Sequence, residues 1–183
     1  MEYIDIIDSE TGNNTGVRKP KSEVHKNGEW HRTVHIWFVN SKNEIMLQHR
    51  SKEMENYPDC WDISVAGHIA SGEDPTTAAL REIKEEIGLN LPVDELKMVG
   101  KIIRQVVLNN ETYFDNEHSN VYLVRTDLDI NKLQMQENEV KSLRWITISE
   151  FKKWVIEKKS NLVPHPKEYP LLFKALDKLQ HSV

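Results

Sequence analysis

Residues 75–87 carry a hydrophobic pattern that predicts an amphipathic helix. Leu80, Ile83 and Ile87 recur at the spacing that places side chains on one face of an α-helix. Asp74 comes just before this stretch, where its side chain can cap the first turn. We therefore expect one helix whose apolar stripe packs on the core and whose remaining faces carry polar residues.

Other stretches are rich in β-branched and aromatic residues or alternate between apolar and polar positions, as strands do. We predict strands at residues 2–8, 33–39, 44–49, 61–66, 98–108, 120–126 and 142–148. Residues 9–22 have the composition of turns and loops. Two further helices are expected near the C-terminus, one capped by Ser149 and one from about Pro170 to Leu179.

The mixture of strands with two or three helices favours an α/β fold with a mixed, mostly antiparallel sheet. A chain of 183 residues can bury a substantial core, and we expect a single domain over residues 1–183. Within it, residues 1–28 are predicted to form an N-terminal extension packed on the same domain, and residues 149–183 the C-terminal helices.

Composition narrows the classes of partner. The formal net charge is −5, with 38% hydrophobic and 29% charged residues, so we expect no nucleic-acid polymer as a partner. Apolar runs fall short of the ~20 residues needed to cross a bilayer, so no membrane association is expected. The single cysteine fits a reducing compartment, and a cytoplasmic location is predicted. A homodimer is compatible with the sequence.

The acidic face of the predicted helix is the first candidate site. Glu82, Glu85 and Glu86 are close together on a helix surface, where three carboxylates repel one another unless a divalent cation binds them. Arg81 precedes them and can orient or neutralise one. Gly67 opens a loop where the backbone can approach a ligand closely. Taken alone, such a cluster can equally be a solvated acidic face.

The spacing of these residues supplies a stronger signal. Residues 67–89 resemble the Nudix box at every defining position, which are Gly67, Glu73, Arg81, Glu82, Ile83, Glu85, Glu86, Gly88 and Leu89. The resemblance implies an α/β/α sandwich that uses Mg²⁺ or Mn²⁺ to assist the attack of water on a diphosphate bond. It also implies that the box glutamates and the Gly67 carbonyl hold the metal, and that Glu73 supports them by pairing with Arg81.

A second, less specific resemblance covers about residues 25–145 and points to isopentenyl-diphosphate isomerase, a Nudix relative. That family binds a divalent metal through three histidines and two acids. The matching positions here are His25, His31, His68, Asp115 and Glu117. The resemblance therefore implies a second metal site, whereas each histidine alone also fits a structural role.

The isomerase family delivers a proton from a cysteine two residues before the third histidine. Ala66 occupies that position here and cannot deliver a proton, and Cys60 does not align with it. The box is also complete, unlike the isomerase box. The sequence therefore favours a Nudix hydrolase that is isomerase-like. The segment 28–40, together with VPHPKEYP at residues 163–170, resembles a bacterial subgroup of such hydrolases.

The predicted reaction needs a general base, and the sequence leaves three candidates open: Glu82, Glu117 and Glu139. Glu139 lies just before a predicted strand, where several Nudix hydrolases carry their base. Arg50 and Arg104 can hold phosphate or lie on the surface. His35 alternates with core residues of a strand and is interpreted as structural.

The predicted function is Mg²⁺-dependent hydrolysis of the P–O–P link in a small nucleoside-diphosphate-type or related organic diphosphate. One alternative is an isomerase-like enzyme, and another is a non-catalytic regulator that binds a diphosphate. The residues outside the box determine which group the diphosphate carries, and the sequence leaves nucleotide, nucleotide-sugar, thiamine and prenyl diphosphates open.

Overall fold

A seven-stranded mixed sheet forms the centre of the computed structural model, which describes residues 2–180. Residues 1 and 181–183 of the predicted domain lie outside the described part. The strands of this sheet are β3 (His31–Val39), β4 (Glu44–Arg50), β5 (Trp61–Asp62), β6 (Val65–His68), β7 (Lys97–Leu108), β8 (Tyr113–Arg125) and β9 (Val140–Thr147). Among the pairs of these strands, β3 and β8 run parallel and the others antiparallel, which confirms the predicted sheet.

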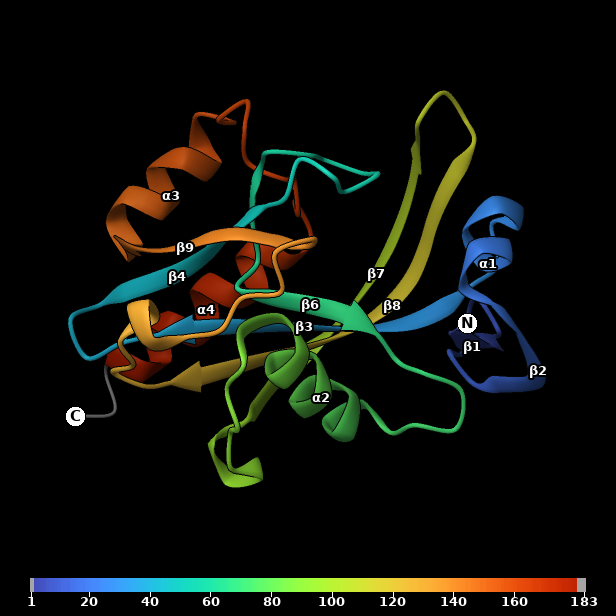
Figure 1. Ribbon diagram of the computed structural model, residues 1–183, viewed down its shortest axis with the longest axis horizontal. Helices are drawn as coiled ribbons and strands as arrows, with labels where there is room; N and C mark the ends of the chain where they lie inside the picture. The colour runs from blue at the N-terminus through green and yellow to red at the C-terminus, as the bar shows by residue number, and fades with distance from the viewer. Residues whose placement is uncertain (1, 181–183) are drawn as a thin grey trace.

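The sheet forks along one edge of β3. This strand pairs with β6 from Thr33↔His68 to Ile36↔Val65, and it meets β4 only at Val39↔Ile45. From there β4 diverges and continues the sheet with β9 and β5. Figure 1 shows β6 lying between the β4–β9 branch and the β3–β8–β7 branch. The outer edge of β6 therefore faces the fork.

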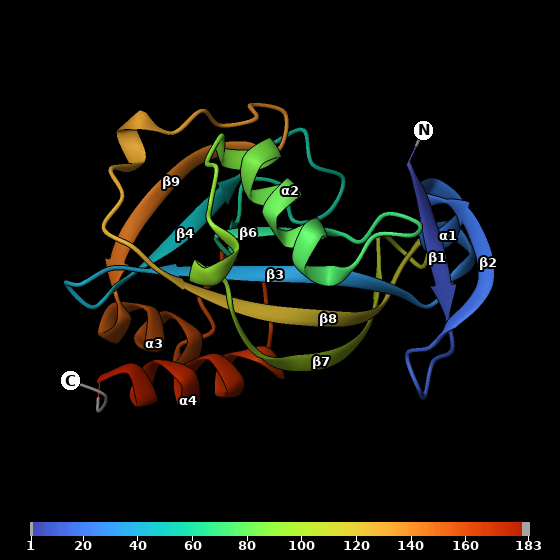
Figure 2. The ribbon, with the colours of Figure 1, turned by 90° about the horizontal axis from the view of Figure 1, so that it is seen from below.

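Helices cover both faces of the sheet, as Figure 2 shows. On one face, α2 (Pro75–Ile87) packs Ile83 and Ile87 against Val34 and Ile36 of β3. On the other face, α3 (Ile148–Ile156) and α4 (Glu168–Gln180) cover a second cluster around Trp37. Neighbouring strand residues point to opposite faces, so β3 contributes to both cores. The expected α/β/α sandwich is confirmed.

The helix ends follow local chemistry. Asp74 accepts hydrogen bonds from the backbone N–H groups of Thr76 and Thr77, and Gly88 ends α2 in the left-handed conformation at φ +69°. The cap of α3 differs from the prediction, because Thr147 rather than Ser149 accepts from the Glu150 N–H. The helix thus begins two residues earlier than the sequence signal indicated.

The N-terminal segment contains more regular structure than predicted. It forms β1 (Tyr3–Ile7), β2 (Asn14–Pro20) and α1 (Lys21–Asn27), whereas the sequence pattern predicted turns and loops over residues 9–22. The side chains of β2 are largely exposed, so this strand lacks the alternation that marks a half-buried strand. Ile4, Ile6 and Val24 form a small separate core.

Hydrogen bonds tie this segment to the loop that precedes α2. The Asp5 carboxylate accepts from the Ser71 hydroxyl at 2.6 Å and from the Gly72 N–H at 3.1 Å. The Ser71 N–H also donates to the Tyr3 carbonyl. Helix α1 packs against β8. None of the described helices is long and apolar enough to cross a membrane.

Candidate active site

A cleft of about 590 Å³ lies on the sheet face that α3 and α4 cover only in part. On this face β3 presents Thr33 and His35 in its first half and Trp37 beyond them. The neighbouring strand β8 also changes from polar to apolar residues along this face, with Glu117 and Ser119 followed by Val121 and Leu123. The apolar half of the face is buried under the C-terminal helices, and the polar half forms the floor of the cleft.

Gly67 of β6 brings a box glutamate onto the backbone at the edge of this cleft. A Cβ atom at Gly67 would lie 2.1 Å from Cδ of Glu82, so the carboxylate of Glu82 fills the space that a side chain would take. Both residues line the cleft. The glycine is therefore needed here because it permits close approach, and its backbone conformation places no separate demand on it.

Arg81 joins three acids of the box. Its Nη1 donates to Glu82 at 2.8 Å and to Glu85 at 3.1 Å, and its Nε and Nη2 donate to Glu73 at 3.0 and 2.9 Å. Nη2 also donates to the His68 carbonyl. The predicted pairing of Glu73 with Arg81 is thus present. Glu85 remains half exposed at the rim, whereas Glu82 is buried.

Glu86 is the most buried glutamate of the box and turns toward the fork. Its carboxylate accepts from the Ala66 N–H on the open edge of β6 at 3.3 Å and from Nε2 of Gln48 at 2.5 Å. Gln48 lies on β4, so both branches of the sheet hold this carboxylate. The sequence pattern gave no signal for Gln48, because a lone glutamine on a strand is unremarkable before its partner is known.

The three box glutamates have different hydrogen-bond partners. Glu82 and Glu85 share Arg81, while Glu86 is held by β4 and β6. Burial raises the pKa of Glu82 to about 7 and raises the pKa of Glu86 well above its ordinary value. Repulsion by a neighbouring acid raises the pKa of each of these two carboxyl groups further.

This donor set suits a hard divalent cation. It consists of carboxylates together with the backbone oxygen of Gly67, which are the ligands that Mg²⁺ and Mn²⁺ prefer. Bound positive charge would also stabilise two buried carboxylates whose raised pKa values show that they are unfavourably ionised. The residues present therefore fit the metal that the family resemblance implies.

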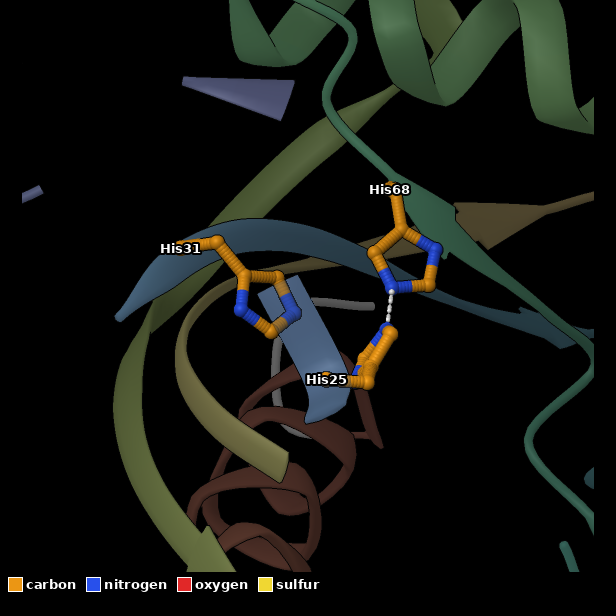
Figure 3. Close-up of side chains that lie close together, drawn as sticks. All are labelled: His25, His31 and His68. Atoms are coloured by element: carbon orange, nitrogen blue, oxygen red, sulfur yellow. Dashed lines mark hydrogen bonds between the residues drawn. The ribbon is translucent and has the colours of Figure 1, made fainter. Parts of the chain in front are cut away.

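Three histidines from distant parts of the chain lie close together (Figure 3), and one of them, His68, also lines the cleft. They are His25 of α1, His31 of β3 and His68 of β6, and one ring nitrogen from each lies within 4.8 Å of the others. Nε2 of His25 is 2.9 Å from Nε2 of His68. His25 and His31 are buried, so neither is a surface histidine. The cluster that the isomerase resemblance implied is present.

Two acids lie beside these histidines. Oε1 of Glu117 is 3.7 Å from Nε2 of His31, and Oδ1 of Asp115 is 3.4 Å from Nδ1 of His25. Burial opposes ionisation of Glu117, but its interaction with His31 prevails and lowers the pKa to about 2. Nε2 of His31 and Oε2 of Glu117 are buried without a hydrogen-bond partner among the described residues. Such orphaned donor atoms fit a cation between them.

A buried polar network supports the cleft from the side of α4. The Glu168 carboxylate accepts from Nδ1 of His35 and from Nε1 of Trp37, each at 2.7 Å. His165 places Nε2 2.7 Å from Asp62, which also pairs with Arg50. His35 and His165 also line the cleft. The VPHPKEYP segment is the sequence signal that could have identified this network.

Glu139 also reaches the cleft. It lies immediately before β9, accepts from Nε2 of Gln136 at 2.9 Å, and is near enough to Glu86 to raise the pKa of that carboxyl. All three candidates for the general base therefore line one cleft. Glu117 is engaged by the histidine cluster and Glu82 by Arg81, which leaves Glu139 as the candidate with no basic partner at hydrogen-bond distance among the described residues.

The fold and the acidic box define a class of enzymes that act on diphosphate linkages. A model of the NUDIX domain matches residues 29–165, and the chain belongs to this family. Nudix hydrolase 3 of Arabidopsis thaliana is 34% identical over 177 residues, which span 94% of this chain and 23% of that protein. The isopentenyl-diphosphate Δ-isomerase of Pectobacterium atrosepticum is 30% identical over 79% of this chain and 76% of its own length.

Solved structures show the same fold. The crystal structure of DR0079 from Deinococcus radiodurans superposes with a TM-score of 0.67 at 20% sequence identity, covering 93% of this chain and 97% of that one. The family assignment from the box and the isomerase-like character are both confirmed, as is the mixed α/β fold. The metal, the substrate and the roles of single residues rest on the geometry of the cleft.

Proposed function

We propose that this protein hydrolyses the P–O–P link of a small organic diphosphate, of nucleoside-diphosphate type or related, with the help of Mg²⁺ or Mn²⁺. The observation that carries the proposal is the contact of Gly67 with Glu82. The missing side chain admits a buried carboxylate to the cleft, next to Glu86, at the spacing of the complete box. A merely solvated acidic face would have no need of this arrangement.

In this proposal Glu82, Glu85, Glu86 and the Gly67 carbonyl hold the metal. When bound, the metal neutralises phosphate charge and makes water more acidic. Arg81 keeps Glu82 and Glu85 in place and is itself fixed by Glu73. Glu139 accepts the proton of the attacking water, because it lines the cleft near Glu86 and is not needed as a ligand.

We further propose that His25, His31, His68 and Glu117 form a second metal site, to which Asp115 can contribute. The support is the set of buried, unpartnered donor atoms described above. Manganese binding to His31→Asn and to His118→Asn, by calorimetry, tests this site. His118 follows Glu117 on β8 but points to the other face, so it serves as control. The His31 variant should lose one bound ion, and unchanged stoichiometry would contradict the site.

The two alternatives fit the cleft less well. An isomerase needs a proton donor at position 66, where an alanine methyl lies against the core. The thiol of Cys60 does not line the described cleft, and burial raises its pKa. A non-catalytic regulator would not require the complete set of box carboxylates. Hydrolysis is therefore the function that the site supports best.

The test is product formation from a panel of nucleoside, sugar-nucleotide, thiamine and prenyl diphosphates, followed by ³¹P NMR with Mg²⁺, Mn²⁺ or a chelator. We expect cleavage of at least one member in the presence of metal and none with the chelator. The Glu139→Gln variant should lower kcat by roughly 10²- to 10⁴-fold and leave metal affinity unchanged. Thermal stabilisation by a panel member without any turnover would contradict hydrolysis and favour the regulator.

A further inference from the structure

Arg104 is a buried guanidinium on the floor of the cleft. It lies on β7 opposite Glu117 of β8, two residues after the core residue Ile102 and so on the same face of the sheet. Its side chain is 14% exposed. Nε and Nη2 are buried and have no hydrogen-bond partner among the residues that the structure describes. The nearest acid, Asp115, is 3.8 Å from Nη2, beyond hydrogen-bond distance.

The other two arginines of the cleft are already committed. Arg81 donates to Glu73, Glu82, Glu85 and a backbone carbonyl. Arg50 donates to the carbonyls of residues 56 and 57 and to Asp62. A guanidinium that has left water without gaining hydrogen bonds is costly unless a ligand supplies the acceptors. Arg104 is therefore the cleft arginine whose donors remain available.

The acids around Arg104 do not satisfy it, because each has another partner. Asp115 faces His25, and Glu117 faces His31. Asp62 pairs with Arg50 and with His165. Arg50 compensates the charge of Asp62, whereas His25 and His31 offset Asp115 and Glu117 only when they are protonated. A cation in the second metal site proposed above would offset these two carboxylates, and an anion could then approach the guanidinium.

We propose that Arg104 binds the terminal phosphate of a singly substituted organic diphosphate, an inference that rests on the function proposed above. The planar fork of a guanidinium matches phosphate oxygens in a bidentate manner. The surroundings of Arg104 on the cleft floor are polar, with His35, Asp62, His165 and Glu117 among the lining residues. The apolar lining residues Ile63 and Val163 are outnumbered by charged and polar groups, which favours an unsubstituted phosphate on Arg104.

The organic group of the substrate then points away from the floor, toward the rim. Met54 and Tyr57 of the loop at residues 53–57 and Tyr113 of β8 also line the cleft and offer apolar surface. This orientation assigns the ends of the substrate. The free phosphate lies on β7 and β8, the linking oxygen lies near the box glutamates, and the substituent lies under the loop at residues 53–57.

A pair of non-hydrolysable ligands tests the assignment without any need for turnover. Methylenediphosphonate has free phosphonates, whereas its P,P′-diethyl ester carries a substituent on both. Binding is measured by calorimetry with Mg²⁺ for the wild type, Arg104→Gln, Arg104→Lys and the control Arg125→Gln, which changes an exposed arginine outside the cleft. We expect the wild type and the control to prefer the free diphosphonate.

The Arg104→Gln variant should bind methylenediphosphonate roughly 10- to 100-fold more weakly and should lose the preference over the diester. Arg104→Lys keeps the charge and lacks the fork, so it should be intermediate. Wild-type affinity in both variants would overturn the proposal. A lower melting temperature with unchanged affinity would show that Arg104 is only structural, and would equally overturn it.

If Arg104→Gln fails to fold, Arg104→Lys decides alone, since a several-fold loss of affinity supports the proposal and wild-type affinity refutes it. The binding result also separates the two proposals. Loss of diphosphonate binding in a protein whose wild type cleaves no diphosphate would leave the anion site standing and refute hydrolysis. Hydrolysis by the wild type, together with diphosphonate binding that does not depend on Arg104, would support the proposed function and refute the anion site.

Discussion

Gly67 and Glu82 act as one unit, because the carboxylate occupies the space that any side chain at position 67 would need. With Glu82 in place, only a glycine at position 67 lets the strand backbone and the helix approach this closely. Arg81 then fixes the carboxylate from the side. The geometry of the proposed metal site depends on this contact rather than on the number of acids on the helix.

We predict that Gly67→Ala reduces turnover by more than roughly 100-fold, since the new methyl group displaces Glu82. The variant should also lose stability, measured by urea denaturation. Removing the obstructing carboxylate should relieve the clash, so Gly67→Ala should be less destabilising in a Glu82→Ala background. Equal destabilisation in both backgrounds would show that Glu82 does not occupy this space.

The titration of Glu82 gives a prediction for the metal-free protein. Its pKa is about 7 in the folded state, above the ordinary 4.5. The neutral form is favoured by folding, so the stabilising contribution is complete below about pH 4.5 and is lost as the pH rises through 7. In the presence of a chelator, the ionisation of Glu82 should lower the free energy of unfolding by roughly 3 kcal/mol as the pH rises from 4.5 to 8.

Glu82→Gln should remove that part of the pH dependence, measured by denaturation at several pH values. The comparison isolates Glu82 from His68, whose lowered pKa acts in the opposite direction because its contribution is lost on acidification. Identical pH profiles for the wild type and Glu82→Gln would mean that this carboxyl is not held in an unfavourable environment. Added Mg²⁺ should flatten the wild-type profile.

At this scale the sequence predicted the box residues well and the supporting residues poorly. Gly67, Arg81 and the glutamates follow a fixed local spacing that one helix and its preceding loop must satisfy. Gln48 has no such local signal, and for Arg104 the sequence left phosphate binding and a surface position open. The side chains of both are turned toward the cleft only when β4 and β7 pair in the sheet.

Among the elements, α4 is fixed to the sheet beside the cleft by its first residue. Its first residue, Glu168, is fully buried and bridges two side chains of β3, His35 and Trp37. This contact lies at the boundary between the open polar half and the covered apolar half of the sheet face. Burial opposes its ionisation, yet the interaction with His35 lowers the pKa of Glu168. The carboxylate therefore fixes the helix to the sheet in its charged form.

We predict that Glu168→Gln destabilises the fold by about 2–4 kcal/mol, because the amide nitrogen would face a donor from His35 or Trp37. Guanidinium denaturation measures the change. Glu157→Gln, at an exposed position after α3, should alter stability by less than about 0.5 kcal/mol. Equal effects of the two substitutions would show that Glu168 does not stabilise the fold in this way.

The elements that the sequence missed share a physical cause. Strand β2 is exposed on both sides and α1 has only seven residues, so neither has a long buried face to produce a periodic pattern. Both are formed through contacts with other parts of the fold, including those of Asp5 with the loop before α2. The core strands and α2 were predictable because each buries a continuous face.

In the whole molecule, the forked sheet explains why residues from so many segments share one cleft. The fork leaves one edge of β6 without a neighbouring strand. There Glu86 accepts a hydrogen bond from the Ala66 N–H of β6, and Gln48 of β4 donates to the same carboxylate. The N-terminal segment contributes Glu2 and Lys21 to the lining of the cleft and His25 to the histidine cluster beside it. An acidic chain with a net charge of −5 thereby presents carboxylates, imidazoles and arginines to one anionic ligand.

The central claim is that the box carboxylates make this cleft a metal-assisted diphosphate hydrolase. The most direct test is steady-state turnover of the best member of the diphosphate panel, as a function of Mg²⁺, for the wild type and for Glu86→Gln. We predict metal-dependent cleavage by the wild type and a loss of at least roughly 1,000-fold in kcat/KM for the variant, with folding retained. Near-normal turnover by Glu86→Gln, or wild-type turnover that persists in a chelator, would contradict it.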